Sequence, residues 1–556
     1  MKKIAIILIG MSLSLLSLAQ VAPQKYFIEF TDKNDSPFSI NRPEEFLSPR
    51  ALERRQNQGI LIDQNDIPVN ENYINSIKNL GVTILTRSKW FNGITIYCVN
   101  HELMDSILRF PFVKSVTKSI ELNNSKPDDK FKIDEVLDEV KQLSGTNDMF
   151  EVSTSFNYGQ SYRQIHMLNG DSMHRMGYRG EGKIIAVLDA GFYKADVLPA
   201  FDSLWENNQI LGTKDFVNPG NNVFLEYEHG MEVLSVMGGN IPGQLIGTAP
   251  KAQYWLLRTE EKASENIIEE YNWVSAAEFA DSAGVDIINS SLGYTTFDDT
   301  TQSHQCSDMD GNTTPVTKGA NLAASKGMII VNSAGNSGGS SWKCISAPAD
   351  GFYVLAIASV DSNGIRSSFS STGESTVRIK PNVAAMGSFT VLSSSIGTIV
   401  RRSGTSFSSP LIAGMTACLW QAAPAWSNSL IMRAIELSSS QISNPDSLLG
   451  YGIPDFPKAL QKLSVENPEN PEAIVFPNPF TTVFKVILES ENVKDMTLQI
   501  FDQLGRLKYE RQNISFKAGE RGYIVNNVED LPAGNYILRL STISTIQTAK
   551  LVKLPL

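Results

Sequence analysis

Four polar residues stand where the chain leaves a predicted strand or enters a predicted helix, and together they could carry out acyl transfer. Asp189 ends an apolar strand, and His229 directly precedes a segment with helical spacing. Asn336 lies in a turn of small residues after a later strand, and Ser406 precedes an apolar helix. Each residue alone is typical of a turn, a cap or a structural side chain. In the order Asp, His, Ser, however, they match one known arrangement of a serine nucleophile, an imidazole base and an orienting carboxylate.

The elements that must position these residues lie between Gly182 and Leu463. Short β-rich runs alternate there with amphipathic helices, which is typical of a parallel sheet covered on both faces. The pattern predicts right-handed crossovers and an α/β sandwich, in which ligands bind at the carboxyl ends of the strands. The predicted strands are 183–188, 254–257, 285–288, 327–332 and 353–358, and the predicted helices include 272–283, 318–326 and 411–420.

Five sequence blocks in this segment occur in the order of a known family. They are Ala186–Gly191, His229–Gly230, Asn289–Gly293, Ser333–Asn336 and Ser403–Pro410. On these blocks, residues 162–463 resemble the subtilisin-like serine proteases. The resemblance implies a three-layer sandwich with a mostly parallel sheet. It also implies a secreted serine endopeptidase that works through an acyl-enzyme intermediate and needs no cofactor for its chemistry.

The resemblance implies a role for each matching polar residue. Ser406 would be the nucleophile, His229 the general base, and Asp189 the carboxylate that fixes the imidazole tautomer. Asn336 would donate its side-chain amide to the oxyanion. A protein or peptide substrate would bind as an added strand along Ser291, Leu292, Gly293, Ala334 and Gly335.

Two departures from the family pattern leave a second interpretation open. Ala190 and Met231 stand where the family usually has hydroxyl residues, so the chain could be a weak or inactive pseudoprotease that binds extended peptides without cutting them. A serine-carboxyl peptidase is disfavoured because it would have Glu in place of His229. An esterase centred on Ser172 is disfavoured because no Gly-x-Ser-x-Gly elbow surrounds it, and helix capping explains this serine.

The segment before the α/β region predicts a small α+β domain over residues 25–118. Alternating strands at 26–30 and 93–99 are interleaved with helix-like stretches at 48–58, 70–80 and 101–110. The segment resembles the ferredoxin-like βαββαβ propeptides of subtilases, which inhibit the enzyme and are then removed. The polar, acidic segment 123–157 reads as an accessible linker, and excision is expected within 123–158. A permanent accessory domain is the alternative.

A second flanking domain follows the spacer 466–472, which has two prolines and no apolar residue. Short alternating strands over 474–556 predict a small all-β sandwich. The segment resembles the sorting domains of the type IX secretion system, which implies that machinery as a partner and passage across a Gram-negative outer membrane. The alternative is an ordinary carbohydrate- or protein-binding β-sandwich.

The N-terminus predicts export. The apolar run 4–18 follows two lysines and precedes a small-residue cleavage pattern at Ala19, and no later run is comparably apolar. We therefore expect a secreted or surface-attached mature chain without a transmembrane segment. The expected organisation is a signal peptide at 1–19, a propeptide at 20–150, a catalytic domain at 151–465, a linker at 466–473 and a sorting domain at 474–556.

The composition bears on nucleic-acid binding and on the number of possible disulfides. The 48 basic and 59 acidic side chains give a net charge of −11 without a dense basic block, so nucleic acid is not an expected partner. Of four cysteines, Cys306 and Cys344 flank one loop-rich region and are the best candidates for a disulfide. Closing that loop would contribute about 4 kcal/mol by chain entropy. Cys98 and Cys418 lie in apolar runs and read as buried thiols.

Metal signals are weak. Residues 308–312 alternate acidic and other side chains as a calcium loop would, but the glycine falls too early and no bidentate Glu follows. A solvated turn is favoured there, and a structural calcium elsewhere stays open without assigned ligands. No zinc motif of the His-Glu-x-x-His kind occurs.

Overall fold

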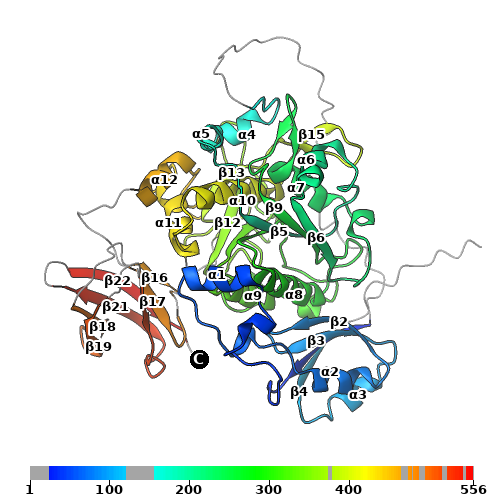
Figure 1. Cartoon of the computed structure of the whole chain (residues 1–556), viewed down its shortest axis with the longest axis vertical. Coiled ribbons are helices and arrows are strands. Elements are labelled where there is room, and N and C mark those ends of the chain that lie inside the picture. The colour runs from blue at the N-terminus through cyan, green and yellow to red at the C-terminus, as the bar shows by residue number, and fades with distance from the viewer. Residues whose placement is uncertain are drawn as a thin grey trace, which may run out of the picture.

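A seven-stranded parallel sheet lies at the centre of the chain (Figure 1). The structure is a computed structural model that describes residues 24–119, 156–373, 378–464, 474–476, 478, 480–487, 495–515, 522–542 and 546–554 of the 556 residues. All strand pairs in this sheet are parallel. The order is β13 (Val383–Met386), β12 (Val354–Val360), β11 (Ile329–Ser333), β10 (Ile287–Ser290), β5 (Ile184–Asp189), β9 (Gln253–Arg258) and β6 (Ile210–Asp215).

Two helical layers cover the sheet because its strands are apolar on both faces. In β5, Ile185 and Val187 enter one buried cluster, whereas Ile184, Ala186 and Leu188 enter the other. Each fully buried side chain of this size contributes roughly 1.5–3 kcal/mol. The first cluster includes α7 (His229–Gly238), α10 (Thr405–Ala422), α11 (Asn428–Ser438) and α12 (Phe456–Ser464), and the second includes α8 (Ile268–Ala283) and α9 (Pro315–Ser325). The predicted three-layer α/β sandwich is thereby confirmed.

Short elements complete the central region. Three helices lie near its start: α4 (Tyr162–His166), α5 (Gly170–Arg175) and α6 (Asp202–Glu206). Two antiparallel pairs lie outside the main sheet: β7 (Asn240–Ile241) with β8 (Leu245–Ile246), and β14 (Thr390–Ser393) with β15 (Ile399–Arg402). The second pair leads directly into α10.

The N-terminal region has the βαββαβ order expected of a ferredoxin-like unit. Its antiparallel sheet runs β2 (Thr83–Ser88), β3 (Gly93–Tyr97), β1 (Lys25–Phe30), β4 (Val113–Lys118). Helices α2 (Glu71–Lys78) and α3 (Leu103–Ile107) add Ile74, Ile77, Met104 and Ile107 to the core of this sheet. Helix α1 (Pro49–Asn57) instead contacts α8, which also contacts β1 and β2, so the N-terminal region covers the outer face of α8 (Figure 1).

Buried charges hold the N-terminal region on α8. The Asp281 carboxylate pairs with Arg54 at 2.5 Å, Arg55 at 2.9 Å and Lys89 at 3.0 Å. Burial alone would raise the pKa of Asp281, but the three cations outweigh it and hold the pKa well below its ordinary value. Glu278, one turn earlier, accepts hydrogen bonds from the Ser88 hydroxyl and from the backbone N–H groups of residues 89 and 90.

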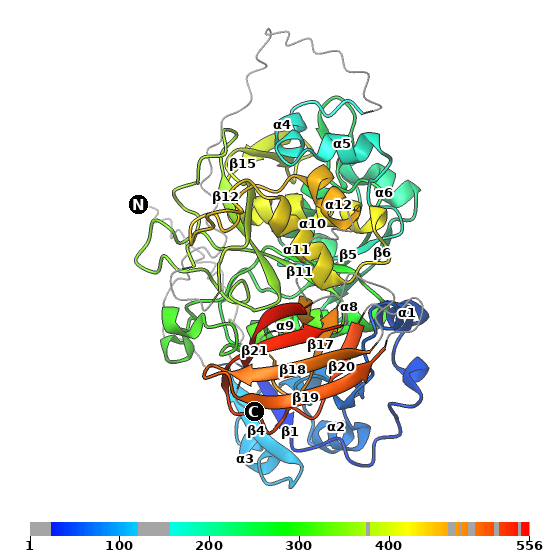
Figure 2. The ribbon, with the colours of Figure 1, turned by 90° about the vertical axis from the view of Figure 1, so that its left-hand side faces the viewer.

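The C-terminal region is a β-sandwich with one buried cluster between its two sheets (Figure 2). The first sheet contains β16 (Ile474–Phe476), β17 (Phe484–Ile487) and β20 (Gly522–Val525). The second contains β19 (Leu507–Ile514), β18 (Met496–Asp502), β21 (Gly534–Ser541) and β22 (Ile546–Lys553). Lys485 donates to the Gln58 carbonyl at 2.6 Å and so joins this sandwich to the N-terminal region.

Several predicted details differ from the structure. The edge strands β6 and β13 were not predicted: β6 is mostly half-exposed, and β13 is only four residues with two alanines, which have low strand propensity. The predicted signal peptide, most of segment 123–157 and the spacer 466–472 lie outside the described residues. Within the described residues, we find no helix with the length and apolar character needed to cross a membrane.

Replacing Asp281 should loosen the N-terminal region. In the chain carrying Ser406→Ala, which removes the nucleophile expected from the sequence, Asp281→Asn takes the buried counter-charge from Arg54 and Lys89 and leaves Arg55 with Asp66 alone. We expect this to destabilise the contact by about 3–5 kcal/mol. Urea-dependent trypsin cleavage of the N-terminal region measures the effect, and Asp196→Asn, which changes an exposed acid, is the control. Equal urea midpoints for the two variants would show that the charge cluster does not hold the contact.

Candidate active site

The carboxyl end of β5 is the point where the strand order of the sheet reverses. The strands that follow β5 up to β9 lie on one side of it, and those from β10 onward lie on the other. Parallel sheets form a crevice for ligands at such a point. Asp189 is the last residue of β5, so its carboxylate stands at this crevice.

Asp189 and His229 form a buried hydrogen-bonded pair. The Asp189 Oδ1 atom lies 2.7 Å from His229 Nδ1 and accepts the Ala190 backbone N–H at 2.8 Å. Because a carboxylate can only accept, Nδ1 carries the proton, and Nε2 is the nitrogen that can accept one. A Cβ on Gly230 would lie 2.5 Å from the Gly191 carbonyl, so glycine permits the first turn of α7 to come this close to β5.

The electrostatic environment favours protonated His229. Burial alone would lower the pKa of this imidazole, since desolvation penalises the charged form. The Asp189 charge, its hydrogen bond and the charge of Glu232 outweigh burial, while Arg402 acts in the opposite direction. The net result is a pKa above the ordinary value, which suits a base that must hold a proton transiently.

Ser406 lies in the first turn of α10, half-buried among buried neighbours. The predicted helix started at residue 411, but α10 begins at Thr405 and contains Pro410. Pro410 has no N–H to donate to the Ser406 carbonyl, and Ser291 Oγ donates to that carbonyl instead, at 2.8 Å. The ring of Phe407, the residue after Ser406, lies 6.0 Å from that of His229, and Ser406 Oγ itself donates to the Ser291 carbonyl at 3.4 Å.

Asn336 is fixed beside Ser406 by Thr405. The Asn336 Oδ1 atom accepts from both the backbone N–H and the hydroxyl of Thr405, each at 2.9 Å. The backbone N–H can only donate, so this contact assigns the amide orientation and turns Nδ2 to the other side. A Cβ built on Gly404 would lie 3.6 Å from Nδ2. Because Gly404 precedes Ser406 by two residues, this donor lies beside the start of the segment that carries the serine.

Some of the predicted substrate-binding residues border Ser406, whereas others have backbone groups that already form hydrogen bonds within the domain. Gly293, three residues after the end of β10, is exposed, and Ser291 donates a hydrogen bond to the Ser406 carbonyl, so this segment borders the serine. Leu292 is buried, with its carbonyl accepting from Asn332 at 3.0 Å. The remaining two are Ala334, whose N–H and C=O both bond within the domain, and Gly335, which donates to the Thr405 hydroxyl at 3.2 Å.

The residues that depart from the family pattern are buried. Met231 is fully buried in the cluster around α7 and α10, and Ala190 is buried in the opposite cluster. Within the described residues, the second carboxylate oxygen of Asp189, Oδ2, is buried without a hydrogen-bond partner. The residue after Asp189 is Ala190, which has no hydroxyl group that could donate a hydrogen bond to Oδ2.

Sequence reasoning missed one pair in the site and misassigned one cap. Glu232, three residues after His229, is fully buried and pairs with Arg402 Nε at 2.8 Å. The only available signal was an acid one turn along the His229 helix. Ser172 was expected to cap a helix, but Asn169 holds the cap position of α5, and Ser172 lies inside the helix and accepts from Arg175 at 2.6 Å.

Outside the crevice, the structure joins Cys306 and Cys344 in a disulfide, and Cys98 and Cys418 are free and buried. In segment 308–312, Asp310 accepts the backbone N–H groups of residues 312 and 313, as in a solvated turn. Among the described residues, one group of carboxylates could hold a cation, and it was not predicted: Glu260, Glu265 and Glu269.

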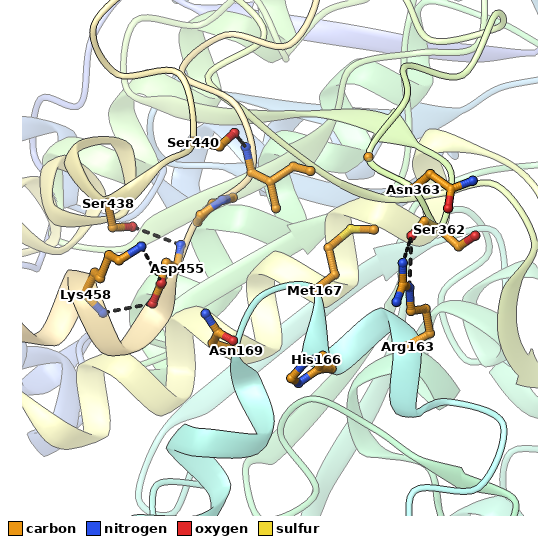
Figure 3. Close-up of a pocket in the computed structure, with 13 residues that line it drawn as sticks. Arg163, His166, Met167, Asn169, Ser362, Asn363, Ser438, Ser440, Asp455 and Lys458 are labelled. Atoms are coloured by element: carbon orange, nitrogen blue, oxygen red, sulfur yellow. Dashed lines mark hydrogen bonds and ion pairs between the residues drawn. The ribbon is translucent and has the colours of Figure 1, made fainter. Parts of the chain in front are cut away.

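A cavity of about 400 Å³ lies away from these residues, between α4, α11 and α12 (Figure 3). Its charged side chains are already engaged: Arg163 donates to the Ser362 carbonyl, and Lys458 pairs with Asp455 at 2.9 Å. Neither Asp189, His229 nor Ser406 lines it. The cavity therefore does not belong to the candidate active site.

Comparisons with known proteins cover all three regions. Residues 25–132 match the family model of the peptidase S8 propeptide domain of Bacteroidota, residues 180–452 match the subtilase family, and residues 474–554 match a secretion system C-terminal sorting domain. Subtilisin E of Bacillus subtilis (strain 168) is 26% identical over 298 residues, covering 53% of this chain and 68% of that protein. Subtilisin of Bacillus pumilus is 25% identical over 284 residues, covering 50% of this chain and 92% of that protein.

Two of the solved structures that are similar to this chain are as follows. MycP1 from Mycobacterium smegmatis has 22% identity and a TM-score of 0.43, covering 55% of this chain and 86% of that chain. The prenylagaramide maturation protease PagA has 22% identity and a TM-score of 0.41, covering 53% of this chain and 98% of that chain.

The family matches identify the class of protein that carries this site, a serine-type peptidase and therefore a hydrolase. The chain contains a subtilase-family domain over residues 180–452, with a propeptide domain before it and a sorting domain after it. The sorting domain indicates export by a secretion system, to a secreted or surface location.

Replacing Asn336 should slow turnover more than it weakens binding. Asn336→Ala removes a donor that would act on charge developing in the transition state, so kcat should fall about 10²–10³-fold with KM little changed. That magnitude was measured for the oxyanion-hole asparagine of subtilisin itself. Steady-state kinetics on a peptide substrate tests the expectation, with Asn363→Ala in the cavity of Figure 3 as the control. A purely KM effect would contradict it.

Proposed function

We propose that this protein is a secreted serine endopeptidase made as a zymogen, with Asp189, His229 and Ser406 as its catalytic triad. The observation that carries the proposal is the buried hydrogen bond of 2.7 Å between Asp189 and His229, at the crevice beside the first turn of α10, which contains Ser406. An exposed Asn336, oriented by Thr405, supplies a donor beside the same serine.

The chemistry follows from these positions. Ser406 Oγ attacks the carbonyl carbon of the scissile peptide bond while His229 Nε2 takes its proton, and Asn336 Nδ2 donates to the resulting oxyanion. The imidazolium, stabilised by Asp189, then gives the proton to the leaving amine as the C–N bond breaks. Water, deprotonated by His229, then attacks the acyl carbon; the bond to Ser406 Oγ breaks, and the imidazolium returns its proton to that oxygen. No cofactor is needed for any of these steps.

The substrate is an extended segment of a protein or peptide. Its backbone pairs with residues 291–293, and Gly293 suits this role because it is exposed at the edge of the crevice. A Cβ on Gly293 would lie 2.0 Å from Ser346 Oγ, so the segment needs glycine there to keep its path. Recognition through backbone groups accepts many sequences.

Maturation removes the N-terminal region. We place the signal peptide at 1–19, the propeptide at 20–150, the catalytic domain at 151–465, the linker at 466–473 and the sorting domain at 474–556. The propeptide acts as an inhibitor that stays on α8 through the Asp281 cluster until it is cut and released. The sorting domain directs the chain through the type IX machinery and across a Gram-negative outer membrane.

A pseudoprotease is the second candidate, and one observation favours it. The buried Asp189 Oδ2 atom has no hydrogen-bond partner within the described residues, which weakens the anchoring of the carboxylate that orients His229. A fluorophosphonate separates the two candidates because only an activated serine reacts with it. Covalent labelling of the wild-type chain but not of Ser406→Ala would support the peptidase.

Self-processing provides the most direct test of the proposal. In an intact-mass time course on signal-free protein, the wild-type chain should lose N-terminal mass through a cut within residues 123–158. The Ser406→Ala chain should keep its full mass, because the nucleophile is gone while the fold is unchanged. If the variant is processed at the wild-type rate in purified form, or hydrolyses denatured protein undiminished, Ser406 is not the nucleophile.

A further inference from the structure

A buried ion pair crosses from the helix of His229 to the strand before Ser406. Glu232 lies on α7 with a side chain 0% exposed, and Arg402, the last residue of β15, has a side chain 12% exposed. Glu232 follows His229 by three residues, so both side chains lie on the same side of α7. Arg402 precedes Ser406 by four residues and ends the strand that leads into α10.

The pair links two elements that must keep a fixed distance. A carboxylate buried at this depth is costly unless it is paired, and the ion pair with Arg402 offsets part of that cost, although neither Glu232 oxygen has a hydrogen-bond partner within the described residues. The same two segments are joined once more where Ser393 of β14 donates its N–H to Ser235 Oγ at 3.0 Å. The β14–β15 hairpin is therefore fastened to the helix that carries the imidazole.

Few charges come from the described elements that make the most extensive contacts with α7. These elements are β5, β8, β14, α10 and residues 199–201. Only β5 contributes a charged side chain, Asp189; α7 itself adds Glu232, preceded by Glu228, and β15 adds Arg402. Glu232 is thus the second carboxylate beside the imidazole, and Arg402 is the cation that compensates it.

We propose that Glu232 and Arg402 are positioning residues of the peptidase. Their ion pair holds the helix that carries His229 against the strand that leads to Ser406, and it places a second negative charge beside the imidazole. This inference rests on the proposed function of the same site.

The charge balance of the pair gives the sign of the expected effects. Glu232 raises the pKa of His229 and Arg402 lowers it, and the contribution of Glu232 is the larger of the two. Burial raises the pKa of Glu232 itself to about 7, while Arg402 favours its ionised form. Glu232→Gln leaves Arg402 unopposed and should lower the pKa of His229 most. The double variant Glu232→Gln/Arg402→Gln should lower it less.

Histidine titration by NMR tests the proposal without relying on activity. The full chain with Ser406→Ala contains five histidines, and His229→Ala identifies the signal of interest. Glu232→Gln should lower the His229 pKa, because it removes a negative charge that raises this pKa and leaves the opposing Arg402 charge in place. An unchanged His229 titration in Glu232→Gln would overturn the proposal. Should that variant fail to fold, the double variant decides: a pKa equal to the parent's rejects the proposal, and a lowered one supports it.

Kinetics of the active chain tests the positioning part. Glu232→Gln should reduce kcat about 10-fold or more with little change in KM, because the serine and the imidazole lose alignment while the substrate segment is untouched. The acid limb of the kcat/KM profile should move to lower pH together with the NMR value. A change in KM alone would contradict positioning. If the wild-type chain neither cuts peptides nor reacts with a fluorophosphonate, the proposed function fails, and the NMR result still stands on its own.

Discussion

The close approach of β5 and α7 is the contact on which the rest of the site depends. A carboxylate that is fully buried must be neutralised or hydrogen-bonded, and Asp189 meets this requirement through His229 and the N–H of Ala190. Gly230 makes the contact sterically feasible, since any side chain there would collide with the end of β5. The close contact between the end of β5 and the first turn of α7 therefore fixes the imidazole relative to the sheet.

Around Ser406, the site is held together by backbone groups at the start of α10 that have no hydrogen-bond partner within the helix. Pro410 removes one helical hydrogen bond from α10, and Ser291 replaces it at the Ser406 carbonyl. The N–H of Thr405, which has no helical partner in the first turn, orients Asn336. In this way, the irregular start of one helix connects the serine, the amide and the edge of the crevice.

Sequence patterns predicted what depends on local order. Asp189 and Asn336 follow apolar strands, and parallel strands bring their carboxyl ends to one edge, so these positions could be inferred from spacing alone. The start of α10 was placed six residues too late, because Pro410 normally marks a helix start and Ser291, which donates to the Ser406 carbonyl in its place, precedes Ser406 by 115 residues. The pairing of Glu232 with Arg402 was equally out of reach, since it depends on how the β14–β15 hairpin folds back onto α7.

The charge cluster around Asp281 would behave differently before and after the proposed cut between the N-terminal region and the subtilase domain. While the chain is intact, Arg54, Arg55 and Lys89 belong to the same molecule as Asp281, so their contacts with it do not depend on the protein concentration. After a cut, the same contacts become bimolecular, and their occupancy depends on dilution and on salt. A protein that reaches the outside of a cell is diluted there. The cut N-terminal region would then dissociate, and the volume into which the protein is released would determine how soon this happens.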